Sequence, residues 1–322
     1  MISNLASNPK RKPSAWAPGL RALAVGAGVL LLSGAFCAGV ALASLNGAVR
    51  DRVIEAKAGL RQALDLPKVW NANAHLDPAG RTPVACPDPR AALVLVTGGQ
   101  SNAANTLPTP LPPRPGVFTF FDGACYETQD PVLGATGTGG SLWTKLGGAL
   151  EAATGRPVVF VHGAVGGSTY ADWLDPRSGY LDRLLRGVGD LRAAGFEPDW
   201  ILWHQGETDA AARVVDTAAL QEEVAELGRR LLDAAPEARL YLFQTSRCVG
   251  TIRAEGRPEV RAAQAAAVAA LPRSELGMNT DALGPEHRFD GCHFNARGRE
   301  AIVEALAPAL LAGLEREEAA VR

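Results

Sequence analysis

The chain has 322 residues, of which 47% are hydrophobic, and its formal net charge is −2. This length and hydrophobic content suffice for a single domain with a sizeable core, so a second domain is not required. The near-zero net charge argues against the broad basic face of a nucleic-acid-binding protein, and we expect no nucleic-acid partner.

The first feature along the chain is an uncharged apolar segment. No charged residue lies between Arg21 and Arg50, and residues 22–45 are rich in Ala, Val, Leu and Gly. A membrane-spanning helix needs about 20 apolar residues, more than the hydrophobic part of a cleaved signal. We therefore predict a basic cytoplasmic tail at 1–21, a transmembrane signal-anchor at 22–45 and an exported (periplasmic or extracellular) C-terminal domain. The alternative is secretion after cleavage near Ala43, where small residues form a signal-peptidase pattern.

Residues 46–89 are predicted to form a stalk or linker, and 90–316 the folded domain. Short apolar runs without polar alternation, typical of strands covered on both faces, alternate with predicted helices. The predicted strands are 91–97, 157–161, 199–203 and 239–243, and the predicted helices are 142–154, 180–194, 210–234, 259–270 and 296–314. This order indicates an α/β fold, a three-layer α/β/α sandwich with a central parallel sheet, preceded by the N-terminal transmembrane helix.

The segment 106–140 interrupts this alternation. It is rich in Pro and Gly and is longer than an ordinary connection between elements. Loops of this length are usually functional or disordered. We predict a rim over the site, with an edge strand at 119–121.

Motifs rich in glycine and polar residues follow three of the predicted strands. They are Gly98–Asn102, Gly163–Thr169 and Trp203–Asp209, and a fourth motif, Asp290–His293, precedes the last predicted helix. In parallel α/β sheets, ligands bind outside the carboxyl ends of the strands. The motifs are therefore expected to meet at one edge of the sheet.

The residue types in these motifs favour acyl transfer. A serine hydroxyl becomes a strong nucleophile when an imidazole accepts its proton and a carboxylate orients that imidazole. Ser101 can supply the hydroxyl, His293 the imidazole and Asp290 the carboxylate. Attack on an ester builds an oxyanion, which a single well-aimed donor stabilises by about 3 kcal/mol. The backbone amides of Ser101 and Gly167 and the side-chain amide of Gln205 are the predicted donors.

These motifs resemble those of the SGNH hydrolase superfamily, in particular the branch that contains sialate O-acetylesterases and the acetylxylan esterases of carbohydrate esterase family 6. The resemblance extends from about Leu93 to Leu310. Its four blocks are matched by Gly99–Asn102, by Gly166–Thr169 with Trp173, by Trp203–Asp209, and by Asp290 with His293. It implies a flavodoxin-like sheet and Ser101 as nucleophile, with Gln205 in the place of the usual Asn. Alignment of the second block favours Gly167 over Gly166 as the oxyanion donor.

The resemblance also implies a substrate class, an O-acetylated carbohydrate, and no cofactor. No spacing of His and Cys typical of a metal site is present. Asn102, Trp173 and His204 are predicted to contact the substrate, although Trp173 can equally pack beneath a loop and His204 can be structural. Glu207 and Asp209 are expected to hold loops. Two other functions stay open: an O-acetyltransferase acting on a cell-envelope polysaccharide, and an inactive carbohydrate-binding domain.

Four cysteines lie in the predicted exported part, namely Cys86, Cys125, Cys248 and Cys292. An even count permits two disulfides with three possible pairings, and four buried free thiols are the alternative. Because Cys248 follows a predicted strand and Cys292 lies inside the last motif, we advance a Cys248–Cys292 bridge as a hypothesis.

Overall fold

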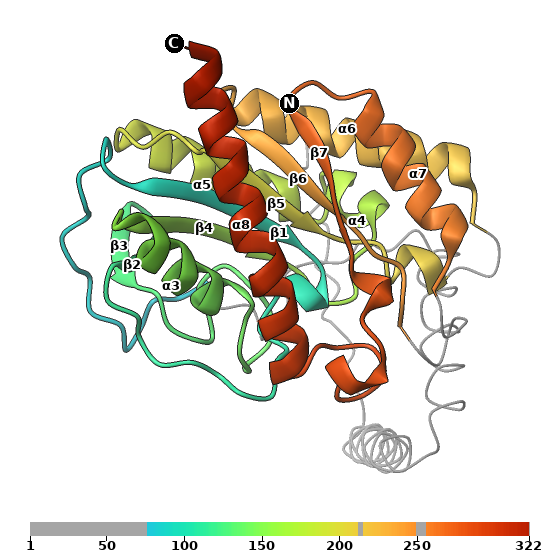
Figure 1. Ribbon diagram of the computed structural model, residues 1–322, viewed down its shortest axis with the longest axis horizontal. Helices are drawn as coiled ribbons and strands as arrows, with labels where there is room; N and C mark the ends of the chain where they lie inside the picture. Colours follow the sequence, from blue (N-terminus) through green and yellow to red (C-terminus); the bar gives the residue numbers. More distant parts are fainter. Residues whose placement is uncertain (1–75, 212–214, 249–255, 322) are drawn as a thin grey trace, which may run out of the picture. The chain divides into compact units, whose positions relative to one another are not determined.

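The computed structural model describes residues 76–211, 215–248 and 256–321 (Figure 1). The predicted basic tail at 1–21, the predicted span at 22–45 and most of the predicted stalk lie outside these residues. In the part of the chain that is described, no helix has both the length and the apolar character needed to cross a bilayer.

A seven-stranded sheet forms the centre of the described residues (Figure 1). Its strands are β1 (Leu93–Gly99), β2 (Val117–Phe121), β3 (Ala124–Glu127), β4 (Val158–Ala164), β5 (Trp200–His204), β6 (Arg239–Gln244) and β7 (Ser274–Asn279). The order is β3-β2-β4-β1-β5-β6-β7, and every neighbouring pair is parallel except β2 with β3. The predicted α/β class, with helices on both faces of a central sheet, is confirmed. The sheet was predicted to be parallel and is mostly so, with β3 as one antiparallel edge strand.

The central strands arise from continuous apolar runs because both faces of the sheet are covered. In β1, Leu93 and Leu95 belong to one hydrophobic core, whereas Val94 and Val96 belong to another. Successive side chains of a strand point to opposite faces, so a strand buried on both faces shows no polar alternation. All four side chains are at most 1% exposed, which explains why the pattern was readable from the sequence.

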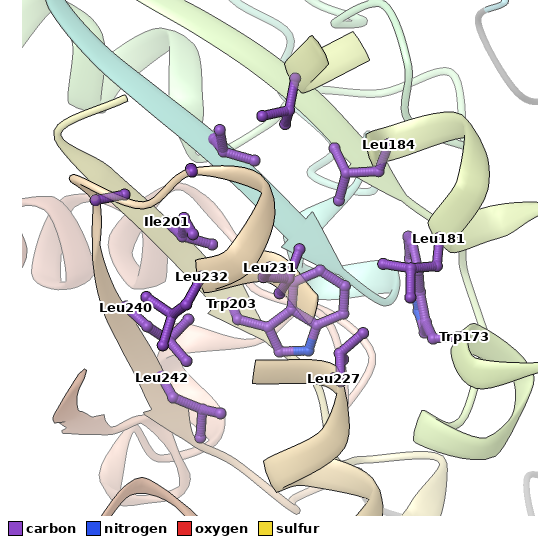
Figure 2. Close-up of a cluster of buried hydrophobic side chains, with 14 of the residues drawn as sticks. Trp173, Leu181, Leu184, Ile201, Trp203, Leu227, Leu231, Leu232, Leu240 and Leu242 are labelled. Carbon is purple, nitrogen blue, oxygen red and sulfur yellow. The ribbon is translucent and has the colours of Figure 1, made fainter. Parts of the chain in front are cut away.

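Helices flank the sheet and complete these two cores. The helices are α3 (Trp143–Thr154), α4 (Tyr170–Leu174), α5 (Tyr180–Ala193), α6 (Thr217–Ala234), α7 (Pro258–Ala269) and α8 (Ala296–Val321). Side chains of α3 and α8 join the core that contains Leu93, and those of α5, α6 and α7 join the core that contains Val94. Figure 1 shows α8 in dark red crossing the sheet in front. Figure 2 shows the other core, with Trp203 of β5 near Leu227 and Leu231 of α6.

Several elements differ from their prediction. Helix α4 was not predicted, and α8 extends beyond the predicted end at 314. The segment 106–140 is more than a rim, because it contributes β2 and β3; the predicted edge strand at 119–121 lies inside the sheet, and β3 forms the edge. β7 was not predicted, since Gly277 is its only buried residue and no apolar run marks it. The predicted helix at 210–234 begins instead at Thr217.

Two disulfides join the four cysteines of the predicted exported part. Cys248 and Cys292 are bonded, with Cα atoms 4.1 Å apart, so the hypothesis of this bridge is confirmed. Cys86 is bonded to Cys125 of β3, with Cα atoms 5.3 Å apart. Val84 also pairs with Cys125 through a β-bridge. The end of the predicted stalk is therefore fixed to the sheet edge.

Candidate active site

The register of the sheet brings three of the predicted motifs to one edge. Gly99 at the end of β1 is paired with Ala164 at the end of β4 and with His204 at the end of β5. Because these strands are parallel, the segments that follow them leave the sheet side by side. The first three motifs therefore share the carboxyl edge, as the sequence analysis predicted.

Ser101 begins a short 3-10 helix, η1 (Ser101–Ala103), directly after β1. Its side chain is 8% exposed. The glycines before it allow the chain to pass close to β5: a Cβ added to Gly98 would lie 2.2 Å from the Trp203 ring, and one added to Gly99 would lie 1.9 Å from the His204 carbonyl oxygen. Only glycine fits at these two positions, so the motif brings the serine tightly against the neighbouring strand.

The turn after β4 lies next to this serine. A Cβ built on Gly166 would be 3.8 Å from the Ser101 Cβ, and the Gly166 amide donates to Thr136 Oγ1 at 2.8 Å. Gly167 is exposed and has a φ of +70°, a left-handed conformation that glycine adopts without strain. The segment 106–140 thus supports the site through Thr136. Thr136 could not be identified from the sequence, because no motif near it marks this contact.

Asp290 and His293 form a hydrogen-bonded pair at the turn of a hairpin. The distance from His293 Nδ1 to Asp290 Oδ2 is 2.7 Å, and Asp290 Oδ1 accepts from the backbone amides of Cys292 and His293 at 2.9 and 2.7 Å. Burial tends to raise the pKa of Asp290, but the hydrogen bonds from the His293 side chain and backbone outweigh it and lower the pKa to about 2. Asp290 is therefore a carboxylate at neutral pH and leaves His293 Nε2 as the ring nitrogen that can meet a hydroxyl.

Asn102 joins the serine motif to this hairpin. Its Nδ2 donates to Glu207 Oε1 at 2.7 Å and to the Cys292 carbonyl oxygen at 3.3 Å, and its Oδ1 accepts from the Phe294 amide at 3.1 Å. The residues on either side of His293 are thus bonded to the residue that follows Ser101. Because Asn102 is only 1% exposed and makes all these bonds, its side chain supports the site from within, contrary to the predicted contact with substrate.

The other two predicted substrate contacts are also buried. Trp173 is 1% exposed and lies in the core, where its Nε1 donates to Ser168 Oγ at 2.9 Å. His204 is fully buried beside the Phe243 and Phe294 rings, and its Nε2 is 3.2 Å from Thr280 Oγ1. Burial lowers the pKa of His204 to about 3, so its ring is neutral. Both side chains pack beneath the site instead of lining it.

Gln205 is fully buried, and its amide ties together the loops after β1, β4 and β5. Its Nε2 donates to the Ser168 carbonyl oxygen at 2.6 Å, to Asp209 Oδ2 at 2.9 Å and to Gln100 Oε1 at 3.1 Å. The carbonyl contact identifies this atom as the nitrogen, because an amide oxygen would be repelled there. An amide nitrogen carries two hydrogens, and protein acceptors surround both. This geometry favours a loop-holding role over the predicted role of oxyanion donor.

Two carboxyl groups lie behind these loops, the buried Glu207 and the partly buried Asp209. Burial raises the pKa of Glu207 to about 7, an effect that the hydrogen bond from Asn102 only partly offsets. Burial likewise raises the pKa of Asp209 to about 6, although Asp209 accepts hydrogen bonds from Gln205 and from the Tyr170 amide. Each carboxyl group holds a loop of the site, which is the role that the sequence analysis expected.

Two glutamines that were not assigned a role complete this network. Gln100 Oε1 accepts from the Thr208 amide at 3.0 Å, which fixes the β1 motif to the β5 motif. Gln264 of α7 donates to the Gln205 and Thr245 carbonyl oxygens at 2.9 and 3.1 Å, joining the loops after β5 and β6. For Gln100, its position beside Ser101 in the first motif was a signal that could have indicated this role. Within the described residues, no group of three or more His, Cys, Asp or Glu could hold a metal ion.

The sequence matches one family model, and the fold is similar to several solved structures. The family model described as carbohydrate esterase, sialic acid-specific acetylesterase matches residues 126–312, which include the Asp290–His293 pair and exclude Ser101. Among solved structures, a protein from Arabidopsis thaliana is 17% identical with a TM-score of 0.56, and the match covers 69% of this chain and 98% of that chain. The structure of NanS is 14% identical with a TM-score of 0.53, covering 72% of this chain and 100% of that chain.

These two structural likenesses concern the fold, because their sequence identities are low. A search of curated proteins found no significant match to the sequence. The family model, in contrast, spans more than half of the chain, including four strands of the sheet and the hairpin that carries His293. The chain therefore belongs to the carbohydrate esterase family of sialic acid-specific acetylesterases, and it is a carboxylic ester hydrolase.

Proposed function

We propose that this protein is a serine esterase that removes O-acetyl groups from a carbohydrate through an acyl-enzyme formed on Ser101. The observation that carries the proposal is the hydrogen-bonded pair of Asp290 and His293, which Asn102 holds beside the serine motif. Membership of a family of carbohydrate acetylesterases supports the substrate class.

In the proposed first step, His293 Nε2 takes the proton of Ser101 as Oγ attacks the acetyl carbonyl carbon. The bond from Oγ to this carbon forms, and the bond from the carbon to the sugar oxygen breaks. The imidazolium then gives its proton to the departing sugar oxygen. Asp290 stabilises the imidazolium and fixes its tautomer, which suits a carboxyl group with a pKa of about 2.

In the second step, water replaces the sugar. His293 accepts a proton from the water as it attacks the acetyl-serine, and collapse of the intermediate returns the proton to Ser101 and releases acetate. The backbone amides of Ser101 and Gly167 are the proposed donors to the oxyanion in both steps, since the Gly166–Gly167 turn lies beside Ser101. Gln205 acts indirectly, by holding the loops that carry these amides.

The test uses the full chain with an O-acetylated sugar, a serine-directed phosphonate and the Ser101→Ala variant. We expect the phosphonate to label Ser101, and the variant to melt like the wild type while acetate release is abolished. Near-wild-type turnover by the variant would refute the mechanism. Acetate release that requires an acceptor glycan would identify a transferase instead, and binding of the sugar without any acetate release would identify an inactive binding domain.

We also propose that the catalytic domain is exported and attached to the membrane through residues 22–45. Two disulfides within the described residues support export, because disulfides persist mainly in oxidising compartments. The basic residues before the apolar segment support this orientation. Protease protection on intact cells, followed by fractionation, tests both points: recovery of a full-length cytoplasmic protein would contradict the proposal.

A further inference from the structure

Phe289 is an aromatic side chain that lies largely in water. It is 51% exposed, and among the described residues the only other large hydrophobic side chain noted as exposed is Leu276, at 41%. Single exposed apolar residues are common on protein surfaces, so exposure alone indicates nothing about function. The position of Phe289 in the hairpin of Asp290 and His293 is what makes it informative.

The hairpin determines where the Phe289 ring lies. Arg288 and Phe294 form an antiparallel bridge and are both buried, with the guanidinium 4.6 Å from the centre of the Phe294 ring. Side chains alternate between the two faces of a strand, so the next pair, Phe289 and His293, occupies the opposite, outer face. The Phe289 amide donates to the His293 carbonyl oxygen at 3.0 Å, which fixes this register.

The two side chains of this outer pair are stacked. The centres of the Phe289 and His293 rings are 5.9 Å apart, and the ring planes differ by 25°. A substrate whose ester reaches His293 therefore has the Phe289 ring as a near neighbour, with the ring face that is turned away from the imidazole open to contact. Phe289 has no polar atom to bind a hydroxyl group, so the ring can contribute only an apolar, flat surface.

We propose that Phe289 is a platform on which the sugar ring of the substrate lies while its ester is attacked. The C–H groups on one face of a sugar ring form an apolar surface, and they are attracted to the electron-rich face of an aromatic ring. The platform contacts the sugar and not the acetyl group, so it determines which alcohol part of an ester is preferred. This inference rests on the proposed function.

A different role would be to position His293 through the stacked rings alone. Loss of such support would lower kcat for every ester, whatever its alcohol part. Loss of a sugar platform raises KM for sugar esters selectively. An ester without a sugar ring therefore separates the two roles.

The experiment compares hydrolysis of glucose pentaacetate and ethyl acetate by the full chain and by Phe289→Ala, Phe289→Leu and Phe289→Trp. For the Ala and Leu variants we expect KM for glucose pentaacetate to rise about 3- to 10-fold, the range typical of losing one aromatic contact. The effect on ethyl acetate should be smaller, about 2-fold at most by the same reasoning. Phe289→Trp, which keeps an aromatic face, should keep KM for glucose pentaacetate close to the wild-type value.

Leu276→Ala is the matched control, because it removes an exposed apolar side chain from β7 and should change neither reaction. An equal rise in KM for both esters, or no rise in KM for glucose pentaacetate, would overturn the platform proposal. A KM for glucose pentaacetate that rises in Phe289→Trp as much as in Phe289→Ala would overturn the platform proposal as well. If the wild type cleaves ethyl acetate but no acetylated sugar, the proposed function itself fails; if it cleaves both and the variants do not discriminate, only the platform fails.

Discussion

Ser101 and His293 belong to two regions of the molecule that are built in different ways. The region around Ser101 consists of strand ends held by buried amides and carboxyls, with Gln100, Gln205 and Glu207 at most 2% exposed. The region around His293 is a hairpin in which the side chains of His293 and Asp290, proposed to be catalytic, are partly exposed. The Phe294 ring anchors it in the core, and its other connections include the bonds of Asn102, contacts from Arg288 and the Cys248–Cys292 disulfide.

This difference predicts which contacts mainly support stability and which mainly support turnover. In the strand-end region, a lost side chain leaves several buried partners unsatisfied, which costs folding free energy. In the hairpin region, loss of a connection other than the buried Phe294 frees the imidazole without disturbing the core. Substitutions in the first region should therefore act mainly on unfolding, and substitutions in the second mainly on turnover. The predictions below test this division.

The largest effect is expected from Asp290→Asn, inside the hairpin. An asparagine cannot stabilise the imidazolium and favours the wrong tautomer of His293, so kcat should fall about 10³–10⁴-fold. The melting temperature should change little, because Asp290 lies at the surface. Steady-state acetate release and a melting curve check this. A variant with kcat within about tenfold of the wild type would remove Asp290 from the mechanism.

Asn102→Ala breaks the connection between the two regions. It leaves Glu207 and the Phe294 amide without this partner and should lower the free energy of unfolding by about 2–4 kcal/mol. It should also lower kcat about 10- to 100-fold, the cost of a displaced catalytic group. Ser274→Ala, which removes hydrogen bonds at the start of β7, is the control: it should lose stability and keep kcat. Unchanged kcat in Asn102→Ala would mean that the hairpin holds His293 in place without the hydrogen bonds of Asn102.

Gln205→Ala lies in the strand-end region and distinguishes two roles. As a holder of loops, Gln205 supports stability by about 1–3 kcal/mol, and its loss should lower the melting temperature and disturb KM as well as kcat. As an oxyanion donor, its loss would lower kcat about 10²–10³-fold with unchanged KM and melting. Kinetics and a melting curve on the same variant decide. We expect the first pattern, with kcat/KM reduced about 10-fold through displaced loops.

The two disulfides offer a matched pair of variants. Replacing Cys248 and Cys292 by serine should lower kcat about 3- to 10-fold, because the hairpin of His293 gains freedom. Replacing Cys86 and Cys125 should leave kcat unchanged, since that bridge holds β3 at the sheet edge. Each pair should lower the free energy of unfolding by about 2–4 kcal/mol. Equal kcat in both double variants would show that the hairpin needs no bridge.

The same division between regions explains how much of the fold could be predicted from the sequence. The strands around β1 were readable because burial on both faces leaves continuous apolar runs. β7 was not, because five of its six residues are partly or fully exposed and the run Ser274–Asn279 resembles a loop. The antiparallel strand β3 was missed inside a segment whose glycines and prolines indicate a loop.

For the candidate site, spacing alone was enough to pair Asp290 with His293, because their bond is local along the chain. The direction in which a side chain points was not readable. Asn102, Trp173 and His204 lie in or beside the proposed catalytic motifs, yet each side chain faces the interior. Hydrogen bonds to residues more than 70 positions away in the sequence fix His204 and Asn102. Conversely, the sequence indicated no role for Phe289, whose side chain is exposed.

The smallest effect on turnover is expected from Glu207→Gln, which tests the buried region through the dependence of stability on pH. The pKa of Glu207 in the folded protein is about 7, against an ordinary value of 4.5. Below about pH 4.5 the group is protonated in both states and has no effect on stability. Between these values the unfolded chain releases the proton while the folded protein keeps it, so stability falls as pH rises, by up to about 3 kcal/mol near pH 7.

Glutamine does not titrate and its oxygen can still accept from Asn102, so the Glu207→Gln variant should escape this loss of stability and keep kcat. Unfolding by urea from pH 4.5 to 8 should show the variant gaining stability relative to the wild type as pH rises. Glu304→Gln on the exposed side of α8 should show no such gain, and a Glu207→Gln variant that follows the wild type at every pH would mean that the carboxyl group is ionised inside the fold.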